Sequence, residues 1–486
     1  MPLDERRGGL PTLVPSKYNK LSLMKYHLIT YGCQMNVADS EEMARPLEAR
    51  GFLRTADPDD ADIILMNTCT VRDQAEHRAK SNLGRLAEWK EADPHRILIV
   101  AGCAASRWGA SIKKRYPFID LVAPATQIEE FPQVVEQVLS ARAVVANEPA
   151  KKVSSRPAVI ARSPSRIGDR GNPSRTRQTS EIPTSPPNTV ADPRNDISLA
   201  SRNDNTALPP RDGTNGTDTS LALFGSAATA YITIMRGCNF SCSYCIVPQV
   251  RGREGYRPIS DILIETTRKG AEGFQEVMLL GQTVNSYRSN GLDFADLLRA
   301  VEKIHSVKAI RFMSPHPRYM TDRLITSMAE CSKVCRHIHL PVQSGSNRTL
   351  KAMKRLYNRE EYLEIVAKLR KAMPDIMITT DIIAGFPGEA PEDFADTLSL
   401  MREVRFDGLF AFKFSSRPGT TAAKLTGDDV SPVEKEKRLQ RVLALNRELV
   451  GVDTQLTSPR QAAGRGPSSG KPLDPGLRLA GKTAVS

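Results

Sequence analysis

The sequence of 486 residues has few of the features that mark secreted or membrane proteins. No run approaches the roughly 18 apolar residues that a membrane span requires. Asp4, Glu5, Arg6 and Arg7 precede no apolar stretch, so the N-terminus does not resemble a secretory signal, and its acids argue against a transit peptide. These absences favour a cytoplasmic protein, which we expect to be a monomer.

Aromatic residues are also scarce, and their distribution divides the chain. They make up 6% of the residues, and segment 151–223 has no aromatic and no cysteine but nine prolines. Such a segment cannot bury enough apolar surface to offset the entropy that ordering would cost. We therefore expect a flexible N-terminus at 1–23, a disordered linker at 146–226 and a low-complexity tail at 451–486.

Short apolar runs alternate with helix-like segments in two regions, 24–145 and 227–450. This alternation predicts βαβ units and parallel sheets, hence an α/β fold. The first region predicts an open parallel α/β domain, and the second predicts a complete or partial β/α barrel. The predicted strands are Tyr26–Tyr31, Ala61–Met66 and Ile97–Ala101 in the first region, and Tyr231–Met235, Glu276–Leu280, Ala309–Met313, His337–Leu340, Met377–Ile383 and Leu409–Phe414 in the second.

Local signals place the ends of two helices. Ser40 is the predicted N-cap of the first helix and Gly51 its stop, while Pro46 should kink or shorten it. The run Ser-Pro-Val-Glu at 431–434 predicts a capping box and a closing helix that ends near Val450.

The net charge favours a polyanionic partner. The chain has 68 Lys and Arg residues against 55 Asp and Glu residues, a formal charge of +13. Such an excess concerns association and not the fold, and nucleic acid is the polyanion it favours most.

Three cysteines lie within one short loop after the strand predicted at 231–235. They are Cys238, Cys242 and Cys245, in the spacing C-x3-C-x2-C. A zinc site would normally close with a fourth ligand, but no other Cys or His occurs between Cys103 and His305. Iron–sulfur clusters are usually held by thiolates, commonly four, so three thiolates leave one iron open. The loop therefore favours an iron–sulfur cluster over zinc.

Three further cysteines each follow a predicted strand of the first region. They are Cys33, Cys69 and Cys103, separated by one βαβ unit each. Because the carboxyl ends of parallel strands share one edge of the sheet, we expect these thiols to converge there. Buried, unrelated cysteines are the alternative.

These motifs resemble those of a known family. The spacing at Cys238 is the signature of radical S-adenosylmethionine (SAM) enzymes, and the runs Gly-Cys-Gln-Met-Asn at 32–36 and Asn-Thr-Cys-Thr-Val-Arg at 67–72 resemble the methylthiotransferases among them. The runs at 280–287, 340–346, 381–389 and 416–420 are similar to the MiaB branch of that family. The resemblance covers residues 25–145 and 229–450, and it implies a radical SAM domain in the second region.

The resemblance implies both cofactors and partners. Two 4Fe-4S clusters would be held, one by Cys238, Cys242 and Cys245 and one by Cys33, Cys69 and Cys103. The first would bind SAM and generate a 5′-deoxyadenosyl radical, and the second would carry the inserted sulfur. The MiaB branch adds a methylthio group to carbon 2 of N6-isopentenyladenosine beside the tRNA anticodon. The implied partners are tRNA, an electron donor and a sulfur source.

The resemblance also implies supporting residues at the carboxyl ends of the barrel strands. Arg251 and Arg253, after the cysteine loop, are predicted to meet tRNA phosphates. Cys331 and Cys335 match no ligand position and are interpreted as incidental thiols. The predicted SAM-binding residues are Tyr244, Gly281, Gln282, Gln343 and Gly385.

Two departures from the family keep alternatives open. Family members normally end in a small β-barrel, the TRAM domain, which the residues at 451–486 do not resemble. The linker at 146–226 is the other departure. The alternatives are a sibling enzyme that acts on threonylcarbamoyladenosine or on a ribosomal-protein aspartate, and a weakly active iron–sulfur RNA-binding paralogue.

Overall fold

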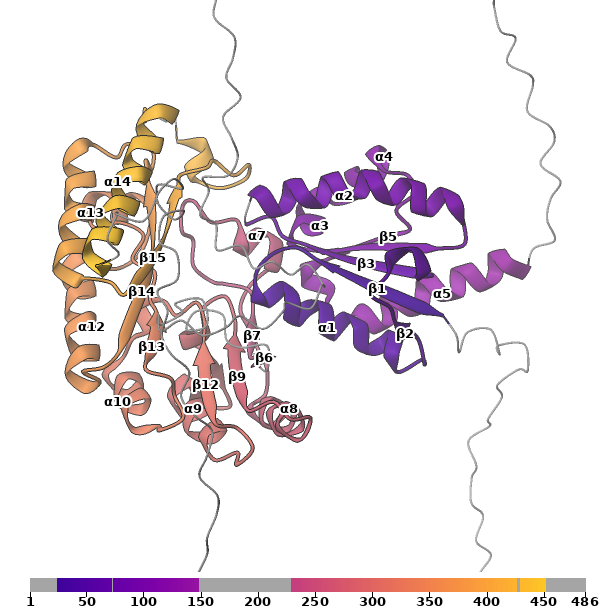
Figure 1. Cartoon of the computed structure of the whole chain (residues 1–486), viewed down its shortest axis with the longest axis horizontal. Coiled ribbons are helices and arrows are strands. Elements are labelled where there is room, and N and C mark those ends of the chain that lie inside the picture. The colour runs from indigo at the N-terminus through magenta and orange to yellow at the C-terminus, as the bar shows by residue number, and fades with distance from the viewer. Residues whose placement is uncertain (1–23, 72, 148–228, 426–428, 452–486) are drawn as a thin grey trace, which may run out of the picture.

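The computed structural model describes residues 24–71, 73–147, 229–425 and 429–451 (Figure 1). The predicted flexible N-terminus and almost all of the predicted linker and tail lie outside these ranges. Both predicted regions fold as α/β units, so the predicted fold class is confirmed. None of the helices in these ranges is both long enough and apolar enough to cross a membrane.

The N-terminal domain is a five-stranded sheet in the order β2-β1-β3-β4-β5, and every neighbouring pair is parallel. Helices α1 and α5 lie on one face and α2 on the other (Figure 1). Its elements are β1 (Lys25–Thr30), α1 (Gln34–Glu48), β2 (Leu53–Arg54), η2 (Pro58–Asp60), β3 (Ile63–Thr68), α2 (Asp73–Ala92), β4 (Ile97–Gly102), α3 (Cys103–Trp108), α4 (Ser111–Arg115), β5 (Leu121–Pro124), η3 (Ala125–Gln127) and α5 (Phe131–Asn147).

The central strands β3 and β4 are buried at every position because helices cover both faces of the sheet. Successive side chains of a strand point to opposite faces. Ile63 and Leu65 therefore pack with α1 and α5, whereas Ile64 and Met66 pack with α2. Continuous apolar runs, and not alternating ones, are the pattern that such strands require.

Helix α1 ends as predicted but begins earlier: Gly51 has φ of +82°, and its amide donates to the Glu48 carbonyl at 2.8 Å. The helix begins at Gln34 with Cys33 as N-cap, so Ser40 lies inside the helix. The Ser40 hydroxyl is instead hydrogen-bonded to the hydroxyl of Thr30 at 2.7 Å, on the side that faces the sheet. Pro46 is accommodated in the last turn, and the helix ends two residues later, at Glu48.

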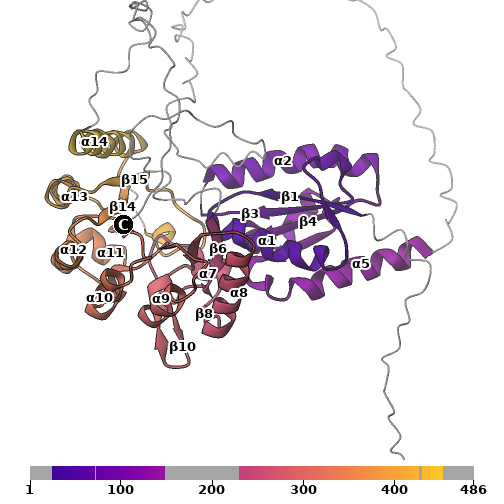
Figure 2. The ribbon, with the colours of Figure 1, turned by 60° about the horizontal axis from the view of Figure 1, so that its bottom comes forward.

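The second region is a partial barrel of six parallel strands, in two three-stranded sheets, β6-β9-β12 and β13-β14-β15. Its helices form an outer layer (Figure 2). Its elements are β6 (Thr229–Thr233), β7 (Met235–Arg236), α7 (Val247–Arg251), β8 (Gly255–Tyr256), α8 (Ile259–Ala271), β9 (Glu276–Leu280), η5 (Val284–Ser286), β10 (Arg288–Ser289), β11 (Leu292–Asp293), α9 (Phe294–Glu302), β12 (Ala309–Phe312), η6 (Pro317–Tyr319), α10 (Asp322–Glu330), β13 (His337–His339), α11 (Asn347–Ala352), α12 (Arg359–Ala372), β14 (Met377–Ala384), α13 (Pro391–Val404), β15 (Gly408–Lys413), η7 (Ala422–Lys424) and α14 (Pro432–Val450).

The closing helix α14 begins and ends as predicted. The Ser431 hydroxyl accepts a hydrogen bond from the Glu434 amide at 3.2 Å, and Pro432 is the first helical residue. The Glu434 carboxylate does not complete the capping box but accepts from Arg438 at 3.0 Å. Val442 packs into the barrel core, which fixes the helix against the sheet.

The two domains pack against each other through α1 and α7 (Figures 1 and 2). Met35 of α1 lies in one apolar cluster with Met278 and Leu280 of β9. In return, Ile246 and Val250 of the barrel join the core of the N-terminal domain. The interface therefore contains apolar contacts from both domains and places α7, which follows the cysteine loop of the barrel, beside α3 at the carboxyl edge of the N-terminal sheet.

Candidate metal centres

The cysteines of the N-terminal domain meet at one edge of its sheet. Cys33, Cys69 and Cys103 follow β1, β3 and β4, which are neighbours in the sheet. The register of these parallel strands brings their carboxyl ends to the same level. The convergence expected from the spacing is therefore present in the structure.

The three thiols are close enough to influence one another. Cys69 and Cys103 are 1% and 2% exposed. Burial raises the pKa of Cys103 to about 12; negative charge on Cys69 and Cys33 acts in the same direction, and Arg251 opposes them. A metal cation reverses this balance, because a coordinating thiol is deprotonated outright. Three converging soft donors fit an iron–sulfur cluster with one position left open.

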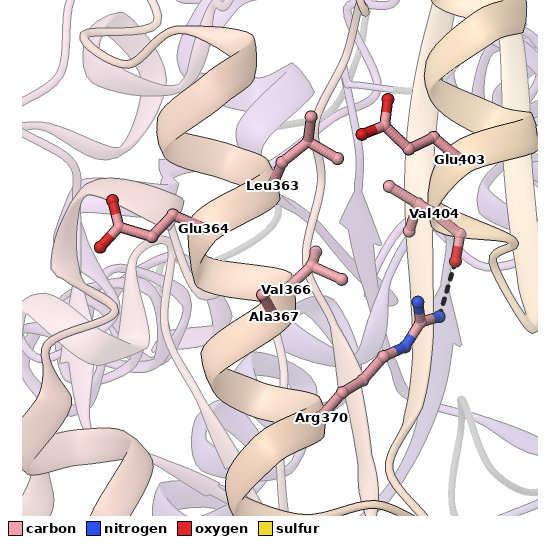
Figure 3. Close-up of a pocket in the computed structure, with 7 residues that line it drawn as sticks. All are labelled: Leu363, Glu364, Val366, Ala367, Arg370, Glu403 and Val404. Atoms are coloured by element: carbon pink, nitrogen blue, oxygen red, sulfur yellow. Dashed lines mark hydrogen bonds between the residues drawn. The ribbon is translucent and has the colours of Figure 1, made fainter.

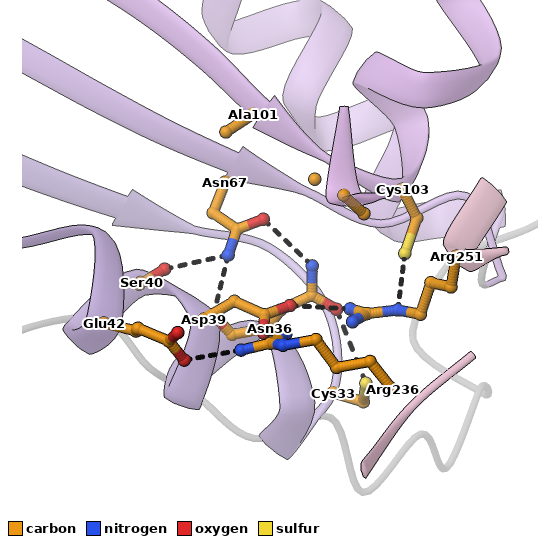
Figure 4. Close-up of polar contacts among 12 residues, drawn as sticks. Cys33, Asn36, Asp39, Ser40, Glu42, Asn67, Ala101, Cys103, Arg236 and Arg251 are labelled. Carbon is orange, nitrogen blue, oxygen red and sulfur yellow. Dashed lines mark hydrogen bonds and ion pairs between the residues drawn. The ribbon is translucent and has the colours of Figure 1, made fainter. Parts of the chain in front are cut away.

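Two buried asparagines hold the loops of Cys33 and Cys69 together (Figure 4). Asn36 donates from Nδ2 to Asn67 Oδ1 at 3.1 Å, and Asn67 donates from Nδ2 to the Asn36 carbonyl at 2.8 Å. Asn36 Oδ1 also lies 3.4 Å from Cys33 Sγ. These amides give the Gln-Met-Asn and Asn-Thr-Cys runs a physical role, because they fix the spacing of two thiols.

Two arginines of the barrel reach into the N-terminal domain and share one carboxylate (Figure 4). Asp39 of α1 is fully buried and forms ion pairs with Arg236 and with Arg251. The Arg251–Asp39 distance is 2.8 Å, and Arg236 also pairs with Glu42 at 2.5 Å. The carboxylate therefore compensates two guanidinium groups that cross the domain interface.

Arg251 is placed differently from its prediction. Its side chain is 4% exposed, so it is not on a surface that RNA phosphates reach. Its Nε donates to Cys103 Sγ at 3.1 Å, and its Nη1 is buried without a hydrogen-bond partner among the described residues. The sequence alone could not show that Arg251 is buried, because its burial depends on how α7 packs against the N-terminal domain. Arg253, two residues later, is exposed, and its contact with tRNA stays a prediction.

The barrel cysteines lie in one loop, after the short strand β7. The loop is held by the Cys238 amide, which donates to the Gly252 carbonyl at 3.1 Å, and by the Cys245 amide, which donates to the Cys242 carbonyl at 3.0 Å. Cys238 Sγ lies 3.4 Å from Thr283 Oγ1. Backbone contacts therefore present all three thiols at the barrel mouth.

Burial also governs the barrel thiols. It raises the pKa of Cys238, and it raises that of Cys245 to about 12 with a further contribution from Cys242. A buried arginine again lies beside the set, since Arg355 Nη1 is 3.5 Å from Cys242 Sγ. Each set of thiols thus has one buried guanidinium that donates to one of its sulfurs.

Two of the predicted SAM-binding residues, Gly281 and Gln282, follow β9 and have structural partners. Gln282 Oε1 accepts a hydrogen bond from the Gly237 amide at 2.5 Å, directly before the cysteine loop. A Cβ on Gly281 would lie 2.3 Å from Cγ of Met235, so close packing requires glycine there. Both residues support the loop, and their contact with SAM stays a prediction.

The other three predicted SAM-binding residues lie around the same mouth. Tyr244 packs with Met353 and Phe386, and its hydroxyl accepts from Arg355 at 3.3 Å. Gln343 pairs with β14 through its backbone, and Gly385 ends that strand with its amide donating to Glu389 at 2.7 Å. The contact of these three residues with SAM stays a prediction.

Cys331 and Cys335 lie apart from both sets. Cys331 is buried in the barrel core after α10, and the Cys335 amide donates to the Ile310 carbonyl at 3.0 Å. Within the described ranges, no three Cys, His, Asp or Glu side chains are arranged to hold one metal ion.

A surface pocket lies away from these cysteines, between the outer helices α12 and α13 (Figure 3). Arg370 crosses it and donates to the Val404 carbonyl at 2.6 Å. Leu363 and Val366 form its apolar wall. It contains no cysteine and does not belong to the candidate metal centres.

Comparison with known proteins finds one matching family model within each of the two domains. Residues 25–124 match the model described as Uncharacterized protein family UPF0004, and residues 232–401 match the Radical SAM superfamily. A solved radical S-adenosylmethionine methyltransferase, TsrM from Kitasatospora setae, superposes with a TM-score of 0.54 at 15% identity, over 82% of this chain and 74% of TsrM. That likeness concerns the fold alone.

The particular family follows from closer relatives. A tRNA-2-methylthio-N(6)-dimethylallyladenosine synthase of Caldicellulosiruptor saccharolyticus is 38% identical over 87% of this chain and 78% of its own length. A synthase of the same name from Syntrophus aciditrophicus is 38% identical over 88% of this chain and 80% of its own length. The chain therefore belongs to the tRNA-2-methylthio-N(6)-dimethylallyladenosine synthase family.

Three charged residues near the cysteines escaped the reasoning from sequence. Asp39 lies three residues after the run at 32–36, but nothing in the sequence showed that it would be buried between two cations. Arg236 directly precedes the Gly-Cys step of the cysteine loop, which was a usable signal of proximity. Arg355 follows a lysine at the end of a short helical segment, and no pattern distinguished it from a solvated base.

Proposed function

We propose that this chain is a radical SAM methylthiotransferase that inserts sulfur and a methyl group at carbon 2 of N6-isopentenyladenosine, next to the tRNA anticodon. The observation that carries the proposal is the presence of two separate sets of three thiols, one in each of two domains that pack against each other. The relatives at 37–38% identity are named for the dimethylallyladenosine product, which favours this substrate over threonylcarbamoyladenosine or a ribosomal protein.

The residues at hand suit two clusters. We assign one 4Fe-4S cluster to Cys238, Cys242 and Cys245, with SAM, and one to Cys33, Cys69 and Cys103. When bound, these groups supply a 5′-deoxyadenosyl radical and the sulfur, chemistry that side-chain acids and bases cannot provide. An external electron donor and a sulfur source are required. The side chains of the protein bind the two clusters, orient them and compensate their charge.

The protein's own contribution is positional. Gln282 and Thr283 fix the loop of Cys238, and the paired amides of Asn36 and Asn67 fix the loops of Cys33 and Cys69. The apolar contact of α1 with β9 packs the domain of one thiol set against the domain of the other. Exposed Arg253 is our candidate for a contact with tRNA phosphate.

Mass spectrometry of tRNA nucleosides tests the proposal directly. The chain is expressed in a host that lacks its own synthase, and the 2-methylthio derivative of N6-isopentenyladenosine is measured. We expect the product to be restored by the parent chain and by Cys335→Ala, but not by Cys242→Ala. Failure of the parent chain to restore the product, while the protein is folded and carries both clusters, contradicts the assignment of substrate.

A further inference from the structure

The inference concerns Arg251, which belongs to the barrel but lies beside a cysteine of the other domain. It stands at the end of α7, and its side chain is 4% exposed. Burial of a charged group in this way is costly unless partners compensate it. The contacts of each nitrogen therefore indicate what the side chain is there to meet.

Two of the three nitrogens have partners. Nε donates to Cys103 Sγ at 3.1 Å, and Nη2 donates to Asp39 Oδ2 at 2.8 Å. Asp39 cannot neutralise Arg251 alone, because it also pairs with Arg236. Arg236 has a second carboxylate in Glu42, whereas Arg251 has no other acid among its described contacts.

The third nitrogen, Nη1, is buried and has no hydrogen-bond partner within the described residues. A buried unpaired donor costs about 1–3 kcal/mol, and more when it is charged, so native structures seldom leave one unmet. Here it belongs to a guanidinium whose Nε already donates to a thiol of the N-terminal set. The missing partner is expected to be an acceptor with negative charge at that set.

We propose that Arg251 is a positioning residue for the cluster of Cys33, Cys69 and Cys103, which receives hydrogen bonds from it across the domain interface. Nε serves the Cys103 sulfur and Nη1 serves a cluster sulfide or the sulfur bound at the open iron. The proposal rests on the proposed N-terminal cluster. Because Arg251 belongs to the barrel, the N-terminal cluster receives this positive charge only when the two domains are docked.

The proposal predicts a change in reduction potential. Hydrogen bonds to cluster sulfurs and nearby positive charge stabilise the reduced, more negative cluster and thereby raise its potential. In Arg251→Gln the N-terminal cluster should be harder to reduce. We expect the equilibrium constant for reduction to fall about tenfold, which is about 59 mV for a one-electron couple.

The experiment isolates that cluster in the full chain with Cys238, Cys242 and Cys245 replaced by alanine. After anaerobic reconstitution, this parent should hold about four irons per chain. If it holds none, the proposed N-terminal cluster fails, independently of Arg251. With four irons, the midpoint potential is measured by redox titration followed by electron paramagnetic resonance, for Arg251→Gln, Arg251→Lys and Arg236→Gln.

Arg236→Gln is the matched control because it removes the other arginine from the same Asp39 without touching a cysteine of the N-terminal set. Support consists of a lower potential in Arg251→Gln, a smaller shift in Arg251→Lys and the parent value in Arg236→Gln. If Arg251→Gln loses its iron while the other two variants retain theirs, the role in holding the cluster is supported. An unchanged potential in Arg251→Gln, or equal effects in Arg251→Gln and Arg236→Gln, overturns the proposal.

Discussion

Cys238, Cys242 and Cys245 lie in one loop, whereas Cys33 and Cys103 lie two βαβ units apart and meet only because a parallel sheet aligns its strand ends. We call Cys238, Cys242 and Cys245 the loop set, and Cys33, Cys69 and Cys103 the sheet set. The loop set depends on local backbone contacts. The sheet set depends on the register of β1, β3 and β4 and on two buried asparagines. Three thiols thus come together in the loop set because they are close in sequence, and in the sheet set because the fold brings them together.

The two sets also differ in the origin of their buried arginine. Arg355 and Cys242 both belong to the barrel, whereas Arg251 crosses from the barrel to Cys103 of the N-terminal domain. Only the sheet set therefore depends on domain docking. Changes at the interface should affect it more than they affect the loop set.

Removing one ligand from each set should have the largest effect and should separate their tasks. Cys242→Ala and Cys69→Ala are both expected to abolish the 2-methylthio product, because a cluster held by two thiolates is not retained. Only Cys242→Ala should also abolish the cleavage of SAM, measured as 5′-deoxyadenosine by chromatography. Loss of 5′-deoxyadenosine in both, or loss of product in Cys335→Ala, would contradict the division of the cysteines.

The next largest effect is expected at the interface. Asp39→Asn removes the charge that two buried arginines share, and breaking a buried pair from one side costs about 3–5 kcal/mol. The free energy of unfolding is measured with urea. The control is Glu41→Gln on the same helix, whose pair with Arg54 is about half exposed and should contribute less than about 1 kcal/mol. Similar losses in the two variants would refute the importance of the shared carboxylate.

A smaller effect is expected from the backbone before the loop set. Gly237 has φ of +79°, and a Cβ there would lie 2.0 Å from the Arg253 carbonyl oxygen. Gly237→Ala should cost roughly 1–3 kcal/mol and lower iron retention in the barrel. Gly84→Ala is the matched control, because Gly84 lies in helix α2 with open space around it and should gain up to about 1 kcal/mol. Iron content and urea unfolding are measured for both variants, and equal iron retention would contradict the prediction.

The smallest effect concerns tRNA. Arg253→Ala should weaken the binding of tRNA to a similar extent for different tRNA sequences. It should also reduce the slope of log affinity against log salt concentration by about 1, as expected for the loss of one phosphate contact. Arg268→Ala is the control, since Arg268 is exposed on α8 and pairs with Glu272. Binding is measured by filter retention at several salt concentrations. An unchanged slope in Arg253→Ala would remove Arg253 from the tRNA interface.

The sequence predicted most of the fold because apolar runs and turn residues are local signals. All nine expected strands are present, with ends shifted by up to two residues. Strands β2 and β5 of the N-terminal sheet escaped prediction because they are short: β2 has two residues, both exposed, and β5 has four. Spacing singled out one set of cysteines and position after strands singled out the other, and their role as cluster ligands stays a prediction. Ser40 and Arg251 were misplaced because their environments depend on the packing of α1 and α7.

Iron counting tests the central claim most directly. We expect about eight irons per chain after anaerobic reconstitution, and about four when either Cys33, Cys69 and Cys103 or Cys238, Cys242 and Cys245 are replaced by alanine. About four irons in the parent chain, or loss of all iron in either variant, would contradict the existence of two independent clusters.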